Sequence, residues 1–394
     1  MKNQLKKVIN FCRGFWLLFK LKYIRKQVIK QSDVVFFFPF YHTGGAERVH
    51  LDIVRTIPSK TCCVIFTHGS ATKNFLEDFK KSAEVIELNS ILNKRNPFIS
   101  KKLQEWIVKS INTNSSIKKV FSSNTNYFYE LLPKLNNHIE KLDLIHALSK
   151  NDERSGVLAK TSTYIDKRIL INKKGKEDLL KIYKEFQVKS SYIDNIQIIS
   201  NGVNIPDIDV LGLKNKSYDP IRVGFVGRWS AEKRPDVFLD IAKQVSSKYP
   251  NIKFVMAGTG MRSNIKKIQT ARVEFLGEIT NLKALHNLYH AMNILIICSE
   301  YEGFPMVLME SMPFGVVPIC TNVGGINEHI SNDENGILID DMDSGKLSAA
   351  FVKHIENLVK NKSVLTLLSE QASDYAVSHF DISSFNKAYQ ELLN

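Results

Sequence analysis

The sequence predicts an α/β fold of two domains, each built on a doubly wound parallel sheet. The chain has 394 residues, of which 44% are hydrophobic, so it is too long for one typical domain and can bury a large core. Continuous apolar runs such as residues 294–299 and 316–320 are typical of strands that are buried on both faces. A short helical stretch stands between these two runs, and the same strand–helix–strand pattern recurs along the chain.

The first half of the chain alternates predicted strands with predicted helices. Residues 33–40 read as the first strand, and Gly44 and Gly45 make a tight turn before a helix that begins at Ala46. Further strands are expected at 61–69, 84–89, 118–123, 141–149, 168–172 and 196–200, with helices at 99–116, 127–135 and 174–186. A turn-rich break at 201–206 ends this domain, which therefore spans 32–205.

The second half repeats the pattern over residues 206–379. Strands are expected at 221–227, 253–260, 273–279, 294–299 and 316–320, and the stretches GGINEHI (324–330) and NGILI (335–339) are expected to finish the sheet. Helices are expected from Pro235, at 281–292, and at 345–360 and 363–380. The stretch from 299 to 325 lies at the centre of this domain.

Two glutamates with seven residues between them stand in that central stretch. Pro305 suits the start of a helix, so Glu302 lies just ahead of the helix and Glu310 lies inside it, on the same face as Met306 and Val307. Glu302 follows a buried strand, and open parallel sheets bind ligands at the carboxyl edge of their strands. The bland alternative is that each carboxylate is a helix cap or a solvated charge.

The chemistry of this stretch favours a nucleotide-sugar. A carboxylate can accept hydrogen bonds from two neighbouring hydroxyls, as sugars and ribose present them. Backbone N–H groups at Gly303, Phe304 and Met306 open the helix, where phosphate is attracted. No His or Cys stands at ligand spacing beside the glutamates, so no metal site is expected there.

Three further side chains stand at predicted strand ends. Arg228 and Lys233 lie in a strand-to-helix loop, where they could clamp a diphosphate or form an ordinary solvated basic loop. His146 ends a strand of the first domain, where it could face a ligand or have a surface or supporting role.

The net charge of +14 does not predict nucleic-acid binding, because of where the charge lies. Residues 1–31 carry nine basic and no acidic side chains, interleaved with aromatic ones, and could lie on an anionic membrane. The alternative is a helix packed on the domain, since the apolar run 14–19 is too short to span a bilayer. The five cysteines favour a reducing compartment.

Together, these stretches resemble a family 4 retaining glycosyltransferase of the GT-B fold, within the glycosyl transferases group 1. The resemblance covers nearly all of residues 33–394 and rests on GGAERV, IQIISNGV, VGRWSAEK, FVMAGTG, FLGEI, SEYEGFPMVLMESMPFG and TNVGGINEHI. It implies two Rossmann-like domains that face each other across a cleft, with the last helix, about 380–394, packing back on the first domain.

The resemblance also implies roles for the residues singled out above. Glu310 would bind the ribose, Glu302 would contact the transferred sugar, and Arg228 and Lys233 would neutralise the leaving diphosphate. The family's catalytic-site histidine matches His146 by order of elements, with His42 and His68 as competitors. The remaining donor contacts would come from Gly44, Gly45, Gly303, Phe304, Pro305, Met306 and Val307.

The implied function is retaining transfer of a sugar from a nucleoside-diphosphate sugar to a glycan or lipid-linked acceptor. Assembly of a bacterial surface polysaccharide, such as capsule, O-antigen or lipopolysaccharide, is expected, at the cytoplasmic face of the membrane. No cofactor and no essential metal are expected, since the Asp-x-Asp triplets at 207–209 and 341–343 lie in connecting segments.

Two other classes stay open on the residues alone. A catalytically silent GT-B partner subunit would keep the same donor motifs. An NAD-dependent oxidoreductase would also be doubly wound, but residues 258–260 lack the third glycine and the later acidic residue of a dinucleotide fingerprint.

Overall fold

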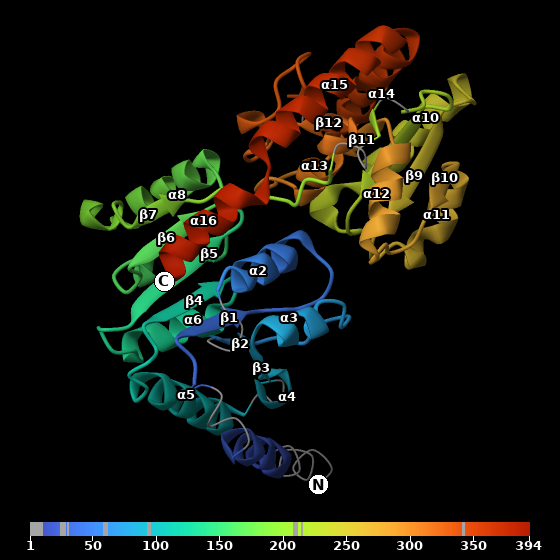
Figure 1. Cartoon of the computed structure of the whole chain (residues 1–394). Helices are drawn as coiled ribbons and strands as arrows, with labels where there is room; N and C mark the ends of the chain where they lie inside the picture. The colour runs from blue at the N-terminus through green and yellow to red at the C-terminus, as the bar shows by residue number, and fades with distance from the viewer. Residues whose placement is uncertain are drawn as a thin grey trace. The chain divides into compact units, whose positions relative to one another are not determined.

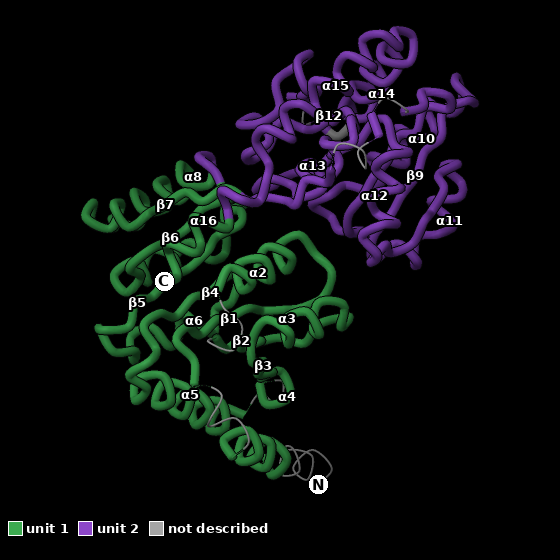
Figure 2. The backbone as a smooth tube through the Cα atoms, viewed as in Figure 1, with its two compact units in different colours: residues 1–171, 175–200, 386–394 green, residues 172–174, 201–385 purple. Residues whose placement is uncertain are grey.

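The computed structural model describes residues 11–23, 29, 31–57, 62–92, 96–207, 212–213, 216–340 and 343–394 (Figure 1). The chain forms two compact units (Figure 2). Unit 1 holds residues 1–171, 175–200 and 386–394, and unit 2 holds residues 172–174 and 201–385. The break therefore follows residue 200 rather than 205, and the segment that returns to unit 1 begins at 386 rather than at about 380. The described part of the basic N-terminal segment, residues 11–23 and 29, belongs to unit 1.

Unit 1 is built on one fully parallel sheet. Its strand order is β3-β2-β1-β4-β5-β6-β7, and every pairing between neighbours is parallel. The strands are β1 (Val34–Phe38), β2 (Cys62–Phe66), β3 (Glu84–Glu87), β4 (Lys119–Ser123), β5 (Glu140–Ile145), β6 (Lys167–Leu170) and β7 (Ile196–Ile198). All residues of β1 and β2 are buried, as the continuous apolar runs predict. The order reverses between β1 and β4, as in a doubly wound sheet.

Helices separate these strands, and the last helix of the chain joins them. The helices are α2 (Gly45–Arg55), α3 (Leu76–Ser82), α4 (Asn89–Leu92), α5 (Pro97–Asn112), α6 (Asn126–Leu131), α7 (Ser155–Thr161) and α8 (Lys173–Glu185). The end of α16 (Ile382–Leu393) lies against β4: Lys119 Nζ donates to Leu392 O at 2.7 Å, and the rings of Phe121 and Tyr389 are 6.1 Å apart. The return of the C-terminal helix to the first domain is therefore present in unit 1.

Residues 11–23 form a helix with one face packed on unit 1. Leu18 is buried in the hydrophobic core of that unit, and Leu17 and Leu21 pack partly buried against it. The helix at 11–23 therefore packs on the domain, which is one of the two alternatives that the sequence left open. Residues 1–10, 24–28 and 30 of the basic segment lie outside the described residues.

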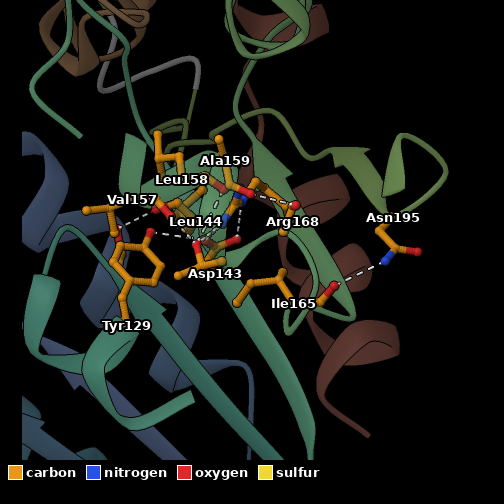
Figure 3. A network of polar contacts seen from close by, with 12 residues as sticks. Tyr129, Asp143, Leu144, Val157, Leu158, Ala159, Ile165, Arg168 and Asn195 are labelled. Carbon is orange, nitrogen blue, oxygen red and sulfur yellow. Dashed lines mark hydrogen bonds and ion pairs between the residues drawn. The ribbon is translucent and has the colours of Figure 1, made fainter. Parts of the chain in front are cut away.

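A buried polar network joins the middle of unit 1 (Figure 3). Asp143 of β5 accepts hydrogen bonds from Arg168 of β6, with Nε to Oδ1 at 3.0 Å and Nη2 to Oδ2 at 2.8 Å, and both side chains are buried. Tyr129 also donates to Asp143 Oδ2 at 3.0 Å, and Arg168 Nη1 donates to Leu158 O at 2.7 Å. The network ties β5 and β6 to the neighbouring helices α6 and α7. Asp143 stands three residues before His146, which follows the end of β5.

Unit 2 has the same architecture with six strands. Its order is β10-β9-β8-β11-β12-β13, again with only parallel pairs. The strands are β8 (Arg222–Val226), β9 (Lys253–Ala257), β10 (Val273–Phe275), β11 (Ile294–Ile297), β12 (Val317–Thr321) and β13 (Ile337–Ile339). The helices are α10 (Pro235–Lys248), α11 (Ile265–Thr270), α12 (Leu282–Ala291), α13 (Met306–Ser311), α14 (Ser344–Lys360) and α15 (Lys362–His379).

Two sequence-based expectations about this sheet are wrong. The stretch GGINEHI is a turn and a short 3-10 helix, η7 (Ile326–Glu328), because Gly324 takes φ +58° and turns the chain out of the extended conformation. The third strand, β10, stops at Phe275 rather than at 279, since Gly277 takes φ +78° just after it. The strand expected at 335–339 is present as β13.

Candidate active site

The candidate donor site lies in unit 2, where the strand order of the sheet reverses. Strands β8 and β11 are neighbours in the sheet. The chain runs from β8 to β9 on one side of this pair and from β11 to β12 on the other side, so the two connections run in opposite directions. Ligands bind at such switch points, beyond the carboxyl ends of the strands. The loop after β8 carries Arg228 and Lys233, and the loop after β11 carries Glu302, so the topology brings the predicted residues to one edge.

Glu302 is held by two donors from these loops. Its Oε1 accepts a hydrogen bond from Lys233 Nζ at 2.5 Å and from Ser299 Oγ at 2.7 Å. The Glu302 side chain is 9% exposed and that of Lys233 is 26% exposed, so this ion pair is largely removed from water. The contact fixes Lys233 beside the carboxylate, whereas the sequence predicts separate roles for the two residues, Lys233 toward the diphosphate and Glu302 toward the sugar. Ser299 is a site residue that sequence reasoning missed.

Arg228 lies on the other end of the same loop and is more open. Its side chain is 57% exposed, and Nη2 lies 3.7 Å from Glu232 Oε1. The pair is a weak surface contact, which leaves the guanidinium accessible for a ligand anion. Arg228 and Lys233 therefore occupy one loop but in different settings, one solvated and one paired with a buried carboxylate.

Close backbone approach explains the glycines of the FVMAGTG stretch. Gly258 has φ +137°, and a Cβ built there would lie 1.8 Å from Gly227 O. Trp229 N also donates to Thr259 O at 2.9 Å, and Gly227 N donates to Ala257 O at 3.0 Å. The glycine turn after β9 therefore supports the loop that carries Arg228, which is a structural task and not a dinucleotide fingerprint.

A second glycine turn supports the Glu302–Gly303 backbone. A Cβ at Gly324 would lie 1.8 Å from Glu302 O, and Gly325 N donates to Gly303 O at 2.8 Å. Asn172 Nδ2 donates to the same carbonyl at 2.9 Å. The TNVGG stretch therefore fixes the turn that precedes α13, and Asn172 is another supporting residue that the sequence did not reveal.

Glu310 has a buried partner of its own. Tyr289, at the end of α12, is 1% exposed, and its hydroxyl donates to Glu310 Oε2 at 2.8 Å. Burial, followed by the charge of Glu310, raises the pKa of Tyr289 well above its ordinary value, so the phenol stays a donor. Tyr289 thus orients one carboxylate oxygen, and its position in an apolar helix gave no signal in the sequence.

Helix α13 separates its accessible and buried sides as its spacing predicts. Met306, Val307 and Glu310 are partly exposed, whereas Leu308 and Met309 are buried. Pro305 is the residue before the first helical one, and the first amides of a helix have no partner one turn earlier. Phe304 is buried and its ring lies 4.6 Å from that of His329, so only its backbone is available to a ligand.

The histidine expected for catalysis lies in unit 1 and is paired with a second one. His146 Nε2 is 3.0 Å from Nε2 of His50, which is buried in α2 and stacks on Phe38 with ring centroids 4.2 Å apart. Burial lowers the pKa of His50 well below its ordinary value. Burial, and then the charge of Arg154, lowers the pKa of His146 to about 4. Both rings are therefore neutral at pH 7, with one donating to the other.

The glycine pair and the competing histidines lie in the same unit. A Cβ at Gly44 would lie 2.1 Å from Glu47 Oε2, so Gly44 leaves room for the carboxylate of Glu47. His42 Nε2 is 3.6 Å from Glu47 Oε1, and His68 is exposed and contacts Thr67 Oγ through Nδ1 at 2.9 Å. Glu47 and His50 were not singled out from sequence, because each looks like an ordinary residue of an amphipathic helix.

Among the described residues, no group of three His, Cys, Asp or Glu side chains converges to hold a metal. Asp343, from one of the Asp-x-Asp triplets, caps α14 by accepting from Gly345 N at 2.9 Å. Positions 208, 209, 341 and 342 of those triplets lie outside the described residues. The prediction of metal independence remains to be tested in solution.

The two parallel-sheet domains are those of the GT-B fold class. HepE from Anabaena, solved in complex with UDP-glucose, superposes with a TM-score of 0.71 at 18% identity, over 91% of this chain and 99% of that chain. Sucrose-phosphate synthase from Thermosynechococcus elongatus superposes with a TM-score of 0.68 at 17% identity, over 91% and 98%. At these identities the likeness shows the fold alone.

Sequence comparison relates part of the chain, including most of unit 2, to glycosyltransferases. Residues 213–376 match the family model described as glycosyl transferases group 1. A Campylobacter jejuni N-acetylgalactosaminyltransferase, named for the undecaprenol-linked substrate on which it acts, is 32% identical over 163 residues, which are 39% of this chain and 44% of that protein. An Escherichia coli UDP-Gal:alpha-D-GlcNAc-diphosphoundecaprenol alpha-1,3-galactosyltransferase is 28% identical over 50% of this chain and 54% of its own. The chain thus spans about half the length of these curated relatives.

Proposed function

We propose that the protein is a retaining glycosyltransferase of family 4 that moves a sugar from a nucleoside-diphosphate sugar to a glycan or lipid-linked acceptor. The observation that carries the proposal is the pair of oriented carboxylates at the switch point of unit 2. Glu302 is fixed by Lys233 and Ser299, and Glu310 by Tyr289. Such acceptors suit the hydroxyls of a sugar and of a ribose.

The charges of the site suit a departing diphosphate. Arg228 and Lys233 lie in one loop, and negative charge on a leaving diphosphate grows only as the glycosidic bond breaks. A bound diphosphate would compete with Glu302 for the ammonium of Lys233, which couples leaving-group binding to the carboxylate beside the sugar. The backbone of Gly303, Phe304, Pro305, Met306 and Val307 would complete the donor pocket.

In the proposed reaction, the acceptor oxygen attacks the anomeric carbon from the face that the diphosphate leaves. The bond from that carbon to the diphosphate breaks, the bond to the acceptor forms, and a phosphate oxygen takes the acceptor's proton. This route needs no protein nucleophile, so Glu302 acts as a hydroxyl acceptor rather than as a hydrolase carboxylate. His146 would contact the sugar as a neutral imidazole, and Gly44 and Gly45 would allow close approach of the donor phosphates.

The relatives suggest the substrate class. HepE is solved with UDP-glucose, and the Campylobacter jejuni and Escherichia coli relatives are named for undecaprenol-linked substrates. A UDP-sugar donor and a lipid-linked acceptor in surface polysaccharide assembly follow as the first choices. We also propose that the protein works peripherally at the inner face of the cytoplasmic membrane. No described helix has the length and apolar character needed to cross a bilayer.

The test is a thermal-shift screen against UDP-, GDP-, ADP-, dTDP- and CMP-sugars, the free nucleotides and NAD. A ligand that binds the native state raises the melting temperature by mass action, so no acceptor has to be known. We expect one nucleoside diphosphate class to shift it. Glu310→Ala should lose the shift, whereas Glu370→Ala, an exposed change in α15, should keep it.

A second variant separates binding from transfer. Glu302→Gln should keep or tighten nucleoside-diphosphate binding, because it frees Lys233, yet it should abolish transfer. Equal loss of nucleotide affinity in the Glu302 and Glu310 variants would refute this division of roles. A shift with NAD alone would favour an oxidoreductase, and donor binding without transfer to any tested lipid-linked acceptor would favour a silent partner subunit.

A further inference from the structure

We propose that the outer face of the helix at residues 11–23 docks on the surface of an anionic lipid membrane. This face is defined by Phe15, Trp16, Phe19 and Tyr23, whose side chains are 52%, 58%, 64% and 83% exposed. Monomeric proteins rarely expose a contiguous apolar patch of this kind without a partner. The proposal rests on the peripheral membrane association proposed above and names the surface that makes it, but it does not depend on sugar transfer.

The inner face of the helix fixes the direction of the outer one. Leu18 is buried in the core of unit 1, Leu17 and Leu21 pack partly buried against that core, and Gly14 is buried. The helix is therefore anchored by its own leucines, and its rings cannot turn inward without removing Leu18 from the core. The aromatic face is a fixed surface of unit 1.

The order of residues around the helix suits a lipid headgroup layer. Phe15, Phe19 and Tyr23 follow each other at intervals of four residues and so lie on one side, with Trp16 beside them. Lys20 and Arg13 lie beside this row on the Trp16 side, and Lys20 Nζ lies 5.3 Å from the centre of the Trp16 ring. Amphipathic aromatic rings with basic side chains at their edge are typical of helices that lie in the membrane interface.

The surface continues from this helix onto α5. The ring of Phe11 lies 6.2 Å from that of Phe98, which is 51% exposed. Lys101 is exposed next to Phe98, and Lys102 Nζ lies 5.8 Å from the Phe98 ring. Two elements that are far apart in sequence thus present the same combination of rings and positive charge.

The charge of this surface favours lipid over a protein partner. Lysine is depleted in the buried centres of protein interfaces, whereas Lys and Arg near an anionic bilayer each contribute about 1 kcal/mol of attraction. The helix at 11–23 contains three basic and no acidic side chains. A lipid-linked acceptor, as proposed above, would also lie at a membrane, but the exposed rings and basic side chains suit an anionic bilayer whatever the acceptor is.

The primary experiment uses the full chain and a single label. Cys12 is the exposed cysteine, and the other four are buried, so an environment-sensitive fluorophore on a thiol reports from this helix. We expect a blue shift and co-sedimentation with vesicles of phosphatidylcholine and phosphatidylglycerol. Both effects should fall with pure phosphatidylcholine and at high salt, because salt screens surface charge.

Two variants test the face itself. Phe15→Ser with Trp16→Ser and Phe19→Ser should weaken vesicle binding by at least roughly tenfold, since these rings supply the apolar area. Arg13→Gln with Lys20→Gln should weaken it by roughly fivefold per residue. These side chains are exposed, so far-UV circular dichroism and the melting temperature should stay as in the native protein.

The matched control changes exposed basic residues of another surface. Lys353→Gln with Lys360→Gln, on α14, should leave vesicle binding unchanged. Equal binding by the aromatic variant and the native chain would overturn the proposal. Failure of the native chain to bind vesicles would also overturn it, and reversible dimerisation in sedimentation velocity would then assign the face to a second copy. The nucleotide-dependent melting shift, measured on the same variants without lipid, reports on the proposed transfer function separately.

Discussion

Replacing Asp143 by alanine should destabilise unit 1 strongly. The carboxylate and the Arg168 guanidinium are 0% and 1% exposed, so neither can be solvated by water when its partner is removed. Asp143 accepts three hydrogen bonds from Arg168, at 2.8, 3.0 and 3.0 Å, and one from Tyr129 at 3.0 Å. Asp143→Ala removes all of these acceptors at once (Figure 3).

The magnitude follows from leaving a charge buried. Arg168 would keep Leu158 O, the Tyr183 hydroxyl and the Thr161 hydroxyl as acceptors but would lose its counter-charge. Breaking a buried pair by removing one partner costs about 3–5 kcal/mol. For a unit of this size, each kcal/mol lowers the melting temperature by about 2–4 °C, so a fall of roughly 6–20 °C is expected.

The assay has to report on unit 1 alone. Of the three tryptophans, Trp16 and Trp106 lie in unit 1 and Trp229 lies in unit 2. In a Trp229→Phe background, tryptophan fluorescence during urea unfolding therefore follows unit 1, and the free energy of unfolding comes from linear extrapolation.

The matched control removes both charges. Asp143→Leu with Arg168→Met leaves no unpaired charge, and apolar replacements of buried ion pairs are often neutral or stabilising. The double variant should therefore be more stable than Asp143→Ala. A loss below about 1 kcal/mol in Asp143→Ala, or an equal loss in the double variant, would refute the reasoning that an uncompensated buried guanidinium causes the effect.

Three further outcomes are expected. Tyr289→Phe removes the donor to Glu310 and should weaken nucleoside-diphosphate binding by roughly 2- to 13-fold, as one hydrogen bond is worth about 0.5–1.5 kcal/mol; unchanged affinity in calorimetric titration would contradict the positioning role. His146 has a folded-state pKa of about 4, below its ordinary 6.5, so the native state binds fewer protons and stability falls as pH drops from about 6.5 to 4. His146→Ala should flatten that pH dependence by up to about 3 kcal/mol, measured by urea unfolding at each pH. Transfer should survive EDTA, and activity that EDTA removes and Mg²⁺ or Mn²⁺ restores would contradict metal independence.

The fold class and most elements were readable from the sequence. Buried parallel strands need apolar residues on both faces, which leaves long apolar runs such as that of β1 and β11, and the helices between them show their own periodicity. The predictions of strands at 324–330 and over the whole of 273–279 were wrong for a local reason. A glycine at positive φ, such as Gly324 or Gly277, ends an extended segment without changing the apolar pattern that predicted it.

The arrangement of the candidate site could be predicted from the sequence where it depends on the position of residues along one short segment. Glu302 lies just before the short helix α13 and Glu310 lies inside it, and Arg228 and Lys233 share one loop, so a few residues of chain set which of these side chains are neighbours. Strand order could not be read in this way. Only the pairing of β8 with β11 brings the two loops together at one edge of the sheet.

The sequence by itself determined which residues can accept sugar hydroxyls, which residues carry positive charge, and that residues 1–31 are rich in basic and aromatic side chains. The tertiary structure alone decided their partners. The pairs of Lys233 with Glu302, Tyr289 with Glu310 and His50 with His146 join residues that are 69, 21 and 96 positions apart. Periodicity reports which face of an element is buried, but the partner of a polar group depends on how separate elements pack, and that packing is set by the whole chain.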